Sequence, residues 1–426
     1  MTKAISFPID NFIQFRNKML NWAQPFNIFC LLDNWQYHFE APAFESMLAV
    51  GCKRKIETVA GNTFEKLKHF YQGEKDWLFG HLGYDLKNET EDLSSTNIDG
   101  IDFPDCLFFV PEIVLQLYED RLIIYCEENA GEIFATIRSH DAYIEQKRAG
   151  PLRIRNRISP DEYISIVKRL QQHILRGDCY EVNFCQEFFA NNAIIDPLTV
   201  YCSLAAISPN PFSALYKLND HYCICSSPER YFKKAGYKIF SQPIKGTTKR
   251  NLEDRELDEI SRQHLLSSEK EKSENVMIVD LVRNDLSRVC RQGTVRVEEL
   301  FGIYSFPQVH QMISTISGEL EENTDWIDVV KATFPMGSMT GTPKRKVMEI
   351  IEQYEHTKRG LFSGAIGYIN PQGDADFNVV IRSILYNAPA KYVSFQAGSA
   401  ITFYSDPEEE YQECLLKAAT MKQVLE

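Results

Sequence analysis

The chain has 426 residues, a formal net charge of −13, 44% hydrophobic residues and 25% charged residues, which is typical of a globular protein that can bury a large core. This acidic balance argues against nucleic-acid binding, which needs a basic face. No apolar run approaches the ~20 residues that span a bilayer, and residues 1–10 lack the pattern of a signal peptide. Eleven cysteines without a Cys-x-x-Cys pair predict reduced thiols and a cytoplasmic location, with no disulfides or zinc site.

The first part of the chain, residues 1–150, is expected to be a mixed α+β region. A polar stretch at 87–100 is predicted to be a surface loop. The basic stretch 147–157 is predicted to link this part to a second part, 151–426. The strands expected here are Ile28–Leu32, Trp77–Gly80, Leu107–Val110, Ile113–Tyr118 and Arg121–Cys126.

The second part mixes helix-start signals with strand hairpins. Ser159–Glu162 forms a capping box, and Pro follows the cap residue again at Asp196 and Asp406. Further helices are expected at 254–267, 269–288 and from Thr342, and strands at 179–189, 213–218, 222–226, 237–242, 309–316, 363–369, 376–386 and 392–397. Hairpins outnumber strand–helix–strand units, so the expected fold class is α+β: a two-part sandwich of large, mainly antiparallel sheets flanked by helices.

Lys245 lies between a strand-like run and the Gly-Thr-Thr turn that is expected at 246–248. A lysine at a strand end can face a pocket, where burial lowers the pKa of the amine and makes it a nucleophile. The alternative is an ordinary surface lysine in a loop.

Two expected helices each carry a pair of glutamates three residues apart, Glu271 with Glu274 and Glu410 with Glu413. Residues at this spacing share one helix face, so the four carboxylates could hold Mg²⁺ together with water. The alternative is that Lys270 or Lys417 pairs with them on a solvated surface.

Several residues are candidates for binding an anionic ligand or for acid catalysis. Residues 335–343, which include Ser338 and Thr340, lead into a helix start, and 396–399 form a Gly-bearing turn whose amides could bind a carboxylate. Arg382 interrupts an apolar strand and needs a carboxylate, either from a ligand or from the protein. Glu229 could be a general acid, or it could pair with Arg230.

Six motifs occur in an order that resembles the chorismate-utilising enzymes. They cover the chain closely from Ser159 onward and more loosely through Leu31-Leu-Asp33. The motifs are Ser227-Pro-Glu-Arg-Tyr231, Pro243-Ile-Lys-Gly-Thr247, residues 274–285, Thr340-Gly-Thr-Pro-Lys344 with Met348-Glu-Ile-Ile351, Ser363-Gly-Ala-Ile-Gly-Tyr368 and residues 406–413.

This resemblance implies a reaction and a division of roles. In the branch that forms 4-amino-4-deoxychorismate, the lysine at the position of Lys245 attacks C2 of chorismate and the glutamate at Glu229 protonates the C4 hydroxyl. Ammonia then displaces the lysine; anthranilate-forming relatives usually have Ala there. The implied Mg²⁺ ligands are Glu274 and Glu413, with Glu271 and Glu410 acting through water, and the implied substrate contacts are Arg382, Gly398, Ser399, Ser338, Thr340 and Thr247.

The resemblance also implies a partner. The sequence has no Gly-x-Cys-x-Gly nucleophile turn with a downstream histidine, so ammonia is expected from a separate glutamine amidotransferase subunit. The alternatives are an anthranilate-forming enzyme and a catalytically silent subunit that binds chorismate or tryptophan.

Four positions depart from the family pattern. The family commonly has His where Gln311 stands, with His310 one position earlier, so either Gln311 takes over its hydrogen bond or His310 reaches the site through a bulge. Glu181 stands where amino-transferring relatives tend to have Gln and hydrating relatives have Lys. Phe362 replaces a frequent Tyr, and Ala400 replaces a Gly.

Overall fold

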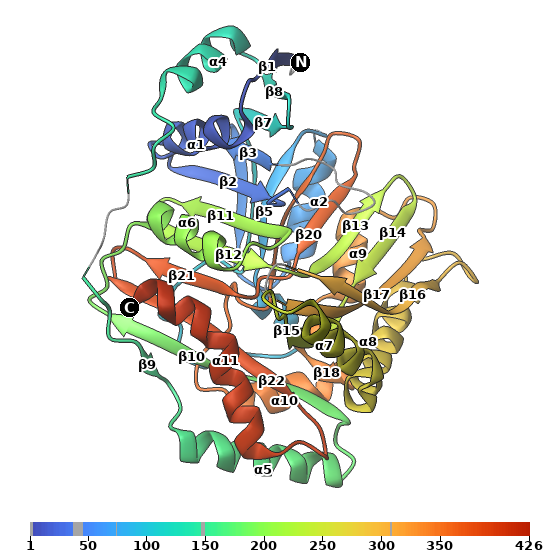
Figure 1. Cartoon of the computed structure of the whole chain (residues 1–426). Coiled ribbons are helices and arrows are strands. Elements are labelled where there is room, and N and C mark those ends of the chain that lie inside the picture. Colours follow the sequence, from blue (N-terminus) through green and yellow to red (C-terminus); the bar gives the residue numbers. More distant parts are fainter. Residues whose placement is uncertain (1–2, 37–45, 74, 146–149, 307–308) are drawn as a thin grey trace.

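A computed structural model describes residues 3–36, 46–73, 75–145, 150–306 and 309–426. Two large sheets carry helices on their outer faces (Figure 1). Every paired strand in these sheets runs antiparallel to its neighbours, which confirms the predicted α+β class. No helix among the described residues is both long and apolar enough to cross a membrane.

The larger sheet has twelve strands and includes both N-terminal and C-terminal parts of the chain. Its path is β1 (Lys3–Pro8), β8 (Arg121–Cys126), β7 (Ile113–Leu117), β3 (Ser46–Val50), β2 (Ile28–Asp33), β11 (Phe212–Leu218), β12 (His221–Ser227), β21 (Ser383–Asn387), β22 (Tyr392–Ile401), β10 (Glu181–Asn191) and β18 (Gly341–Thr342), with β9 (Arg155–Asn156) paired to β10.

The smaller sheet has ten strands. Its path is β15 (Ile244–Lys249), β17 (Val309–Glu319), β14 (Lys238–Gln242), β13 (Arg230–Ala235), β20 (Ala375–Asn378), β19 (Ala365–Ile369), β5 (Leu78–Leu82), β6 (Cys106–Val110) and β4 (Arg54–Thr58), with β16 (Arg296–Ser305) paired to β17. Each sheet takes strands from both 1–150 and 151–426, and the division near residue 150 stays a prediction. Residues 147–149 of the expected linker lie outside the described residues.

The helices complete the sandwich on its two outer faces. Those that pack on the larger sheet are α1 (Phe12–Ala23), α4 (Ala130–Ser139), α5 (Pro160–Leu175), α6 (Pro197–Ile207), α10 (Lys344–Tyr354) and α11 (Pro407–Leu425). Those that pack on the smaller sheet are α2 (Thr63–Gly73), α8 (Glu269–Ser287) and α9 (Trp326–Thr333). The remaining elements are α3 (Lys87–Thr90), α7 (Arg255–Ser267) and the short turns η1 (Tyr84–Leu86) and η2 (Gly337–Met339).

Strand β2 shows how sequence alternation builds the layers. All six of its residues are buried, because each face of the strand packs against a different core. Ile28, Cys30 and Leu32 face the core between the sheets, whereas Phe29 and Leu31 face the helices outside. An apolar run without polar alternation is what a strand buried on both faces requires.

The predicted helix starts are confirmed where a polar side chain caps the helix. The Ser159 hydroxyl accepts from the Glu162 amide at the start of α5, and the Asp406 carboxylate accepts from two amides at the start of α11. Ser268 caps α8 by accepting from the Glu271 amide. Two of these caps therefore fix the first turns of the helices that carry the four glutamates.

One predicted strand was wrong, and one predicted loop was wrong only in its first four residues. The strand expected at 376–386 is two strands, β20 and β21, in different sheets, and the chain passes between the layers at 379–382. Arg382 lies at the end of this passage with φ of +51°, which is outside the extended region that regular strand residues adopt. The loop expected at 87–100 begins with α3, whose Lys87 is buried because Asn88 and Ser95 accept hydrogen bonds from its amine.

The aromatic core of the smaller sheet predicts a stability effect. Phe377 is fully buried and packs against Phe108, Phe232 and Trp326. Phe377→Ala is expected to lower the free energy of unfolding by about 3–5 kcal/mol, measured by chemical denaturation. Tyr404→Ala, at a side chain that is 92% exposed, should change it by less than ~0.5 kcal/mol; equal effects would contradict this account of the core.

Candidate active site

Lys245 connects the two sheets through a buried ion pair. Its amine lies 2.6 Å from Glu181 Oε1, and the residues are 8% and 1% exposed. Lys245 belongs to β15 in the smaller sheet and Glu181 to β10 in the larger one. Lys245 is therefore a buried residue, and the alternative of a surface loop lysine is wrong.

The turn expected at 246–248 is also wrong, since β15 continues through these residues to Lys249. Gly246 breaks the regular register of the strand with a φ of +88°. A Cβ atom at this position would lie 2.9 Å from a carboxylate oxygen of Glu271. The glycine therefore permits both the local bend beside Lys245 and the close approach of α8.

The ionisation of Lys245 differs from the sequence-based expectation. Burial alone lowers the pKa of the amine, but the negative charges of Glu181, Glu274 and Glu229 outweigh burial and raise the pKa above its ordinary value. The amine is consequently an ammonium in this structure. A nucleophilic role requires that its proton first pass to an acceptor, and Glu181 Oε1 is in hydrogen-bond contact with it.

Glu229 has the properties of a general acid. It follows β12, is 4% exposed, and accepts a 2.6 Å hydrogen bond from the Ser338 hydroxyl on η2. Burial raises its pKa to about 7, although the Ser338 hydrogen bond and the charge of Lys245 oppose the shift. The alternative pairing with Arg230 is absent, because that guanidinium binds Asp376 and Gln242.

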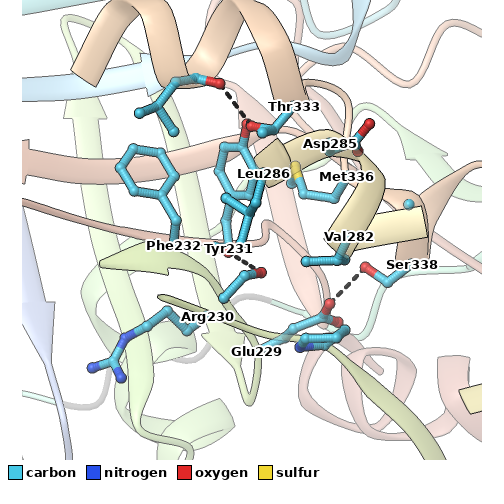
Figure 2. A pocket seen from close by; sticks show the side chains of 14 residues that line it. Glu229, Arg230, Tyr231, Phe232, Val282, Asp285, Leu286, Thr333, Met336 and Ser338 are labelled. Atoms are coloured by element: carbon cyan, nitrogen blue, oxygen red, sulfur yellow. Dashed lines mark hydrogen bonds between the residues drawn. The ribbon is translucent and has the colours of Figure 1, made fainter. Parts of the chain in front are cut away.

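A largely apolar pocket explains the burial of Glu229. Figure 2 shows the carboxyl group and Ser338 on one side of this pocket and the hydrogen-bonded Tyr231 and Thr333 on another. Between them lie Val282, Leu286 and Met336, together with the other lining residues Arg230, Phe232, Ser241, Pro243, Asp285, Val329 and Gly337. Apolar walls of this kind favour the protonated carboxyl group over the carboxylate.

The four glutamates lie around Lys270. Burial lowers the pKa of Lys270, but the negative charges of all four glutamates raise it above its ordinary value; they are Glu410, Glu274, Glu413 and Glu271. Lys270 lies 3.4 Å from a Glu410 oxygen and Lys417 lies 2.7 Å from a Glu413 oxygen, so lysines do pair with these residues, as the alternative held. The pairing is incomplete, since buried oxygens of Glu274 and Glu410 have no hydrogen-bond partner among the described residues.

These orphaned oxygens fit a hard cation. Burial raises the pKa of Glu274 to about 7, and the positive charges of Lys245 and Lys270 offset this effect only in part. As the side chains stand, no three acidic, histidine or cysteine residues in the described part of the chain are close enough to hold a metal ion. Carboxylate oxygens are ligands that Mg²⁺ prefers. Lys270 and Lys417 would have to move away from these oxygens before the ion could bind.

Arg382 and the segment 396–399 lie at an open strand edge. The segment belongs to β22 and is not a turn, so that prediction was wrong; β10 pairs with it, placing Gly398 opposite Cys185 and Ser399 opposite Phe184. Strand β21 pairs with β22 only as far as Phe395, so Arg382, directly before β21, lies beside the unpaired edge. Within the described chain the guanidinium of Arg382 has no hydrogen bond or ion pair, although its carbonyl accepts from the Ser226 amide. Burial lowers the pKa of this side chain, which suits a carboxylate ligand.

The other predicted contacts have different surroundings. Thr340 is fully buried and its hydroxyl donates to the Met336 carbonyl. Thr247 is exposed and lies opposite Gln311 on the neighbouring strand. Gln311 is buried with an unpartnered side-chain oxygen. The two nitrogens of the His310 ring contact Ser305 and Asp258, so Gln311, not His310, has a polar group available.

The contact between Lys245 and Glu181 could not be inferred from the sequence, because 64 residues separate them and they belong to different sheets. The only feature of the sequence that pointed to this contact was Glu181 itself, because relatives tend to have Gln or Lys at its position. Phe362 and Ala400, the other departures from the family pattern, are both buried.

Comparison with known proteins identifies the family of the chain. The family model described as "chorismate binding enzyme" matches residues 31–423. The chain belongs to the chorismate-binding enzyme family. Among these enzymes it is 32% identical to aminodeoxychorismate synthase component 1 of Bacillus subtilis (strain 168) over 373 residues, which cover 84% of this chain and 78% of the relative.

Two further members of the chorismate-binding enzyme family carry a different name. Anthranilate synthase component 1 of Aquifex aeolicus (strain VF5) is 32% identical over 387 residues, covering 85% of this chain and 76% of the relative. The crystal structure of anthranilate synthase component I from Streptococcus pneumoniae TIGR4 matches with a TM-score of 0.80 and 26% identity, over 91% of this chain and 94% of that one.

The ion pair makes a testable prediction about Lys245. Glu181→Gln removes the nearest negative charge and keeps an oxygen as hydrogen-bond acceptor, so the pKa of Lys245 should fall. The pH dependence of its ¹³Cε chemical shift measures this, with Lys245→Met identifying the signal. Glu187→Gln, six residues further along β10 and also buried, should leave that pKa unchanged; a Lys245 signal that titrates identically in both variants would argue against the assigned charge balance.

Proposed function

We propose that the chain converts chorismate and ammonia into 4-amino-4-deoxychorismate and water, as the chorismate-converting component of an aminodeoxychorismate synthase. The observation that carries the proposal is a buried lysine, Lys245, whose charge interacts with a buried acid of pKa about 7, Glu229. The name of the Bacillus subtilis relative supports the same reaction.

The first step requires Lys245 as a free amine. Its proton passes from Nζ to Oε1 of Glu181, which is already in hydrogen-bond contact. The nitrogen lone pair then attacks C2 of chorismate, both double bonds of the ring shift, and the C4–oxygen bond breaks. Glu229 gives its proton to the departing hydroxyl, which leaves as water. The result is a secondary ammonium that joins Lys245 to the ring.

In the second step ammonia attacks C4, both double bonds shift back, and the bond between C2 and the Lys245 nitrogen breaks. The lysine leaves as a neutral amine and recovers its proton from Glu181. The product carries the new nitrogen as an ammonium, and Glu229 takes up a proton from water before the next turnover. Covalent capture thus divides one difficult displacement into two easier ones.

Substrate carboxylates require positive groups. Arg382 is proposed to bind the enolpyruvyl carboxylate beside the open edge of β22 at Gly398 and Ser399. Gln311, with its unpartnered oxygen, is proposed to hold a substrate hydroxyl, and Ser338, Thr340 and Thr247 supply lesser contacts.

Mg²⁺ is proposed to be held by Glu274 and Glu413, with Glu271 and Glu410 acting through water. When bound, it would fix the ring carboxylate of chorismate and draw electron density from the ring. The unpartnered oxygens of Glu274 and Glu410 support this assignment. Ammonia is proposed to come from a separate glutamine amidotransferase subunit.

Formation of anthranilate is the second candidate, because relatives of equal identity carry that name. Lys245 argues against it, since an amine near C2 competes with ammonia for that carbon. A catalytically silent subunit is a third reading; it would show no turnover with chorismate, Mg²⁺ and ammonium even when an active amidotransferase is present.

The covalent step predicts a mass change. Incubation with chorismate and Mg²⁺ without ammonia should add the mass of chorismate less one water to the intact protein, on the peptide that contains Lys245. Lys245→Ala should show no adduct, should lose most 4-amino-4-deoxychorismate formation and should gain anthranilate, which fluoresces. Glu229→Gln should slow adduct formation by about 10²- to 10⁴-fold. Wild-type product and rate in Lys245→Ala would remove the lysine from the mechanism.

Metal binding can be tested without turnover. Glu274→Gln and Glu410→Gln should each weaken Mg²⁺ binding by about 10- to 100-fold, measured by isothermal titration calorimetry. Glu269→Gln is the matched control, because it changes the same helix at a side chain that is 88% exposed. Equal Mg²⁺ affinity in all three variants would exclude these glutamates as ligands.

A further inference from the structure

Arg359 is a fully enclosed cation that lies outside the proposed reaction. It follows α10, its side chain is 1% exposed, and its guanidinium lies over the ring of Tyr84 at 4.6 Å. Two of its donors bind the Glu355 carboxylate, at 2.9 and 2.6 Å. Because its donors are used within the protein, it has no group to offer a ligand and can act only through the residues that it holds.

The backbone groups held by Arg359 lie next to two residues of the site. One donor binds the carbonyl of Met339 at 2.6 Å and another binds the carbonyl of Asn183 at 2.8 Å. Met339 directly follows Ser338, the hydrogen-bond donor to Glu229. Asn183 lies two residues after Glu181, the partner of Lys245. One side chain therefore ties η2 to β10, which hold the polar neighbours of the acid and of the nucleophile.

Glu355 completes this connection. It is 4% exposed, and one of its oxygens accepts both from Arg359 and from the Cys185 amide on β10 at 2.9 Å. A buried ion pair needs such additional hydrogen bonds, because losing either partner leaves an uncompensated charge. Among the described residues, Arg359 is also the only hydrogen-bond donor to the Met339 carbonyl, whereas the next carbonyl, of Thr340, accepts from Asn183.

We propose that Arg359, paired with Glu355, is a positioning residue that keeps the Ser338 hydroxyl within hydrogen-bond reach of Glu229. The inference rests on the proposed function only for the role of Glu229 as an acid. The Ser338 hydrogen bond opposes the effect of burial on the pKa of Glu229. Loss of the Met339 contact lets η2 move, which removes this hydrogen bond and raises the pKa above about 7.

The test is a titration of the Glu229 carboxyl group by difference infrared spectroscopy, in which each protein is compared with its Glu229→Gln counterpart. The wild-type midpoint is expected near pH 7, and Ser338→Ala and Arg359→Lys should each move it upward. The double variant Ser338→Ala/Arg359→Lys should move it no further than Ser338→Ala alone, because both changes remove the same hydrogen bond. An unshifted midpoint in Arg359→Lys, or additive shifts in the double variant, would overturn the proposal.

Two further variants separate positioning from general destabilisation. Glu355→Gln keeps the size of the side chain and should also raise the Glu229 midpoint. It provides the test if Arg359→Lys does not fold. Arg16→Lys changes another buried arginine, paired with Asp33, and should lower stability without moving the midpoint. A shift in Arg16→Lys equal to that in Arg359→Lys would overturn the proposal.

Kinetics give an independent readout. Arg359→Lys should lower kcat for chorismate and leave KM nearly unchanged, with the alkaline limb of the kcat profile moved to higher pH, because a general acid works in its protonated form. The infrared titration needs no turnover, so a failure to form 4-amino-4-deoxychorismate would reject the proposed function and leave the positioning result standing. Turnover to that product with an unshifted carboxyl would reject only the role of Arg359.

Discussion

The ion pair between Lys245 and Glu181 is the interaction on which the site depends. Burying two charges is costly unless each compensates the other, and here the pair also crosses from one sheet to the other. The two layers must therefore keep a fixed spacing for the charges to meet. A lysine in this setting rests as an ammonium, and its reactivity depends on how readily its neighbours accept and return a proton.

Two acids of the site reach a similar pKa, about 7, for different reasons. Glu229 lies against apolar walls and its carboxylate accepts from one neutral hydroxyl. Glu274 lies among other carboxylates, and the charge of Lys245 only partly offsets its burial. Glu229 is suited to exchange a proton near neutral pH, whereas Glu274 is suited to give up its proton when a cation binds. The same pKa thus suits the proposed acid in one place and the proposed metal ligand in the other.

Features set by neighbours in the sequence could be predicted, and features set by distant contacts could not. The caps at Ser159 and Asp406 and the glutamate pairs on α8 and α11 depend on residues two or three positions apart. The break after β20 depends on which sheet each half joins, and no local pattern in 376–386 records it. The raised pKa of Lys245 depends on Glu181, 64 residues away. Sequence patterns therefore predicted the candidate residues but not the charge balance among them.

The crossing at 379–382 has a mechanical consequence. The only residue proposed to grip the enolpyruvyl carboxylate, Arg382, belongs to the short connector between β20 in one layer and β21 in the other. A ligand bound to Arg382 is therefore attached to the connector between the two sheets and not to a strand of either sheet. Binding of the proposed substrate to Arg382 would restrict movement of this connector and of the two sheets relative to each other. Bound substrate would then help to keep Lys245 and Glu181 in contact.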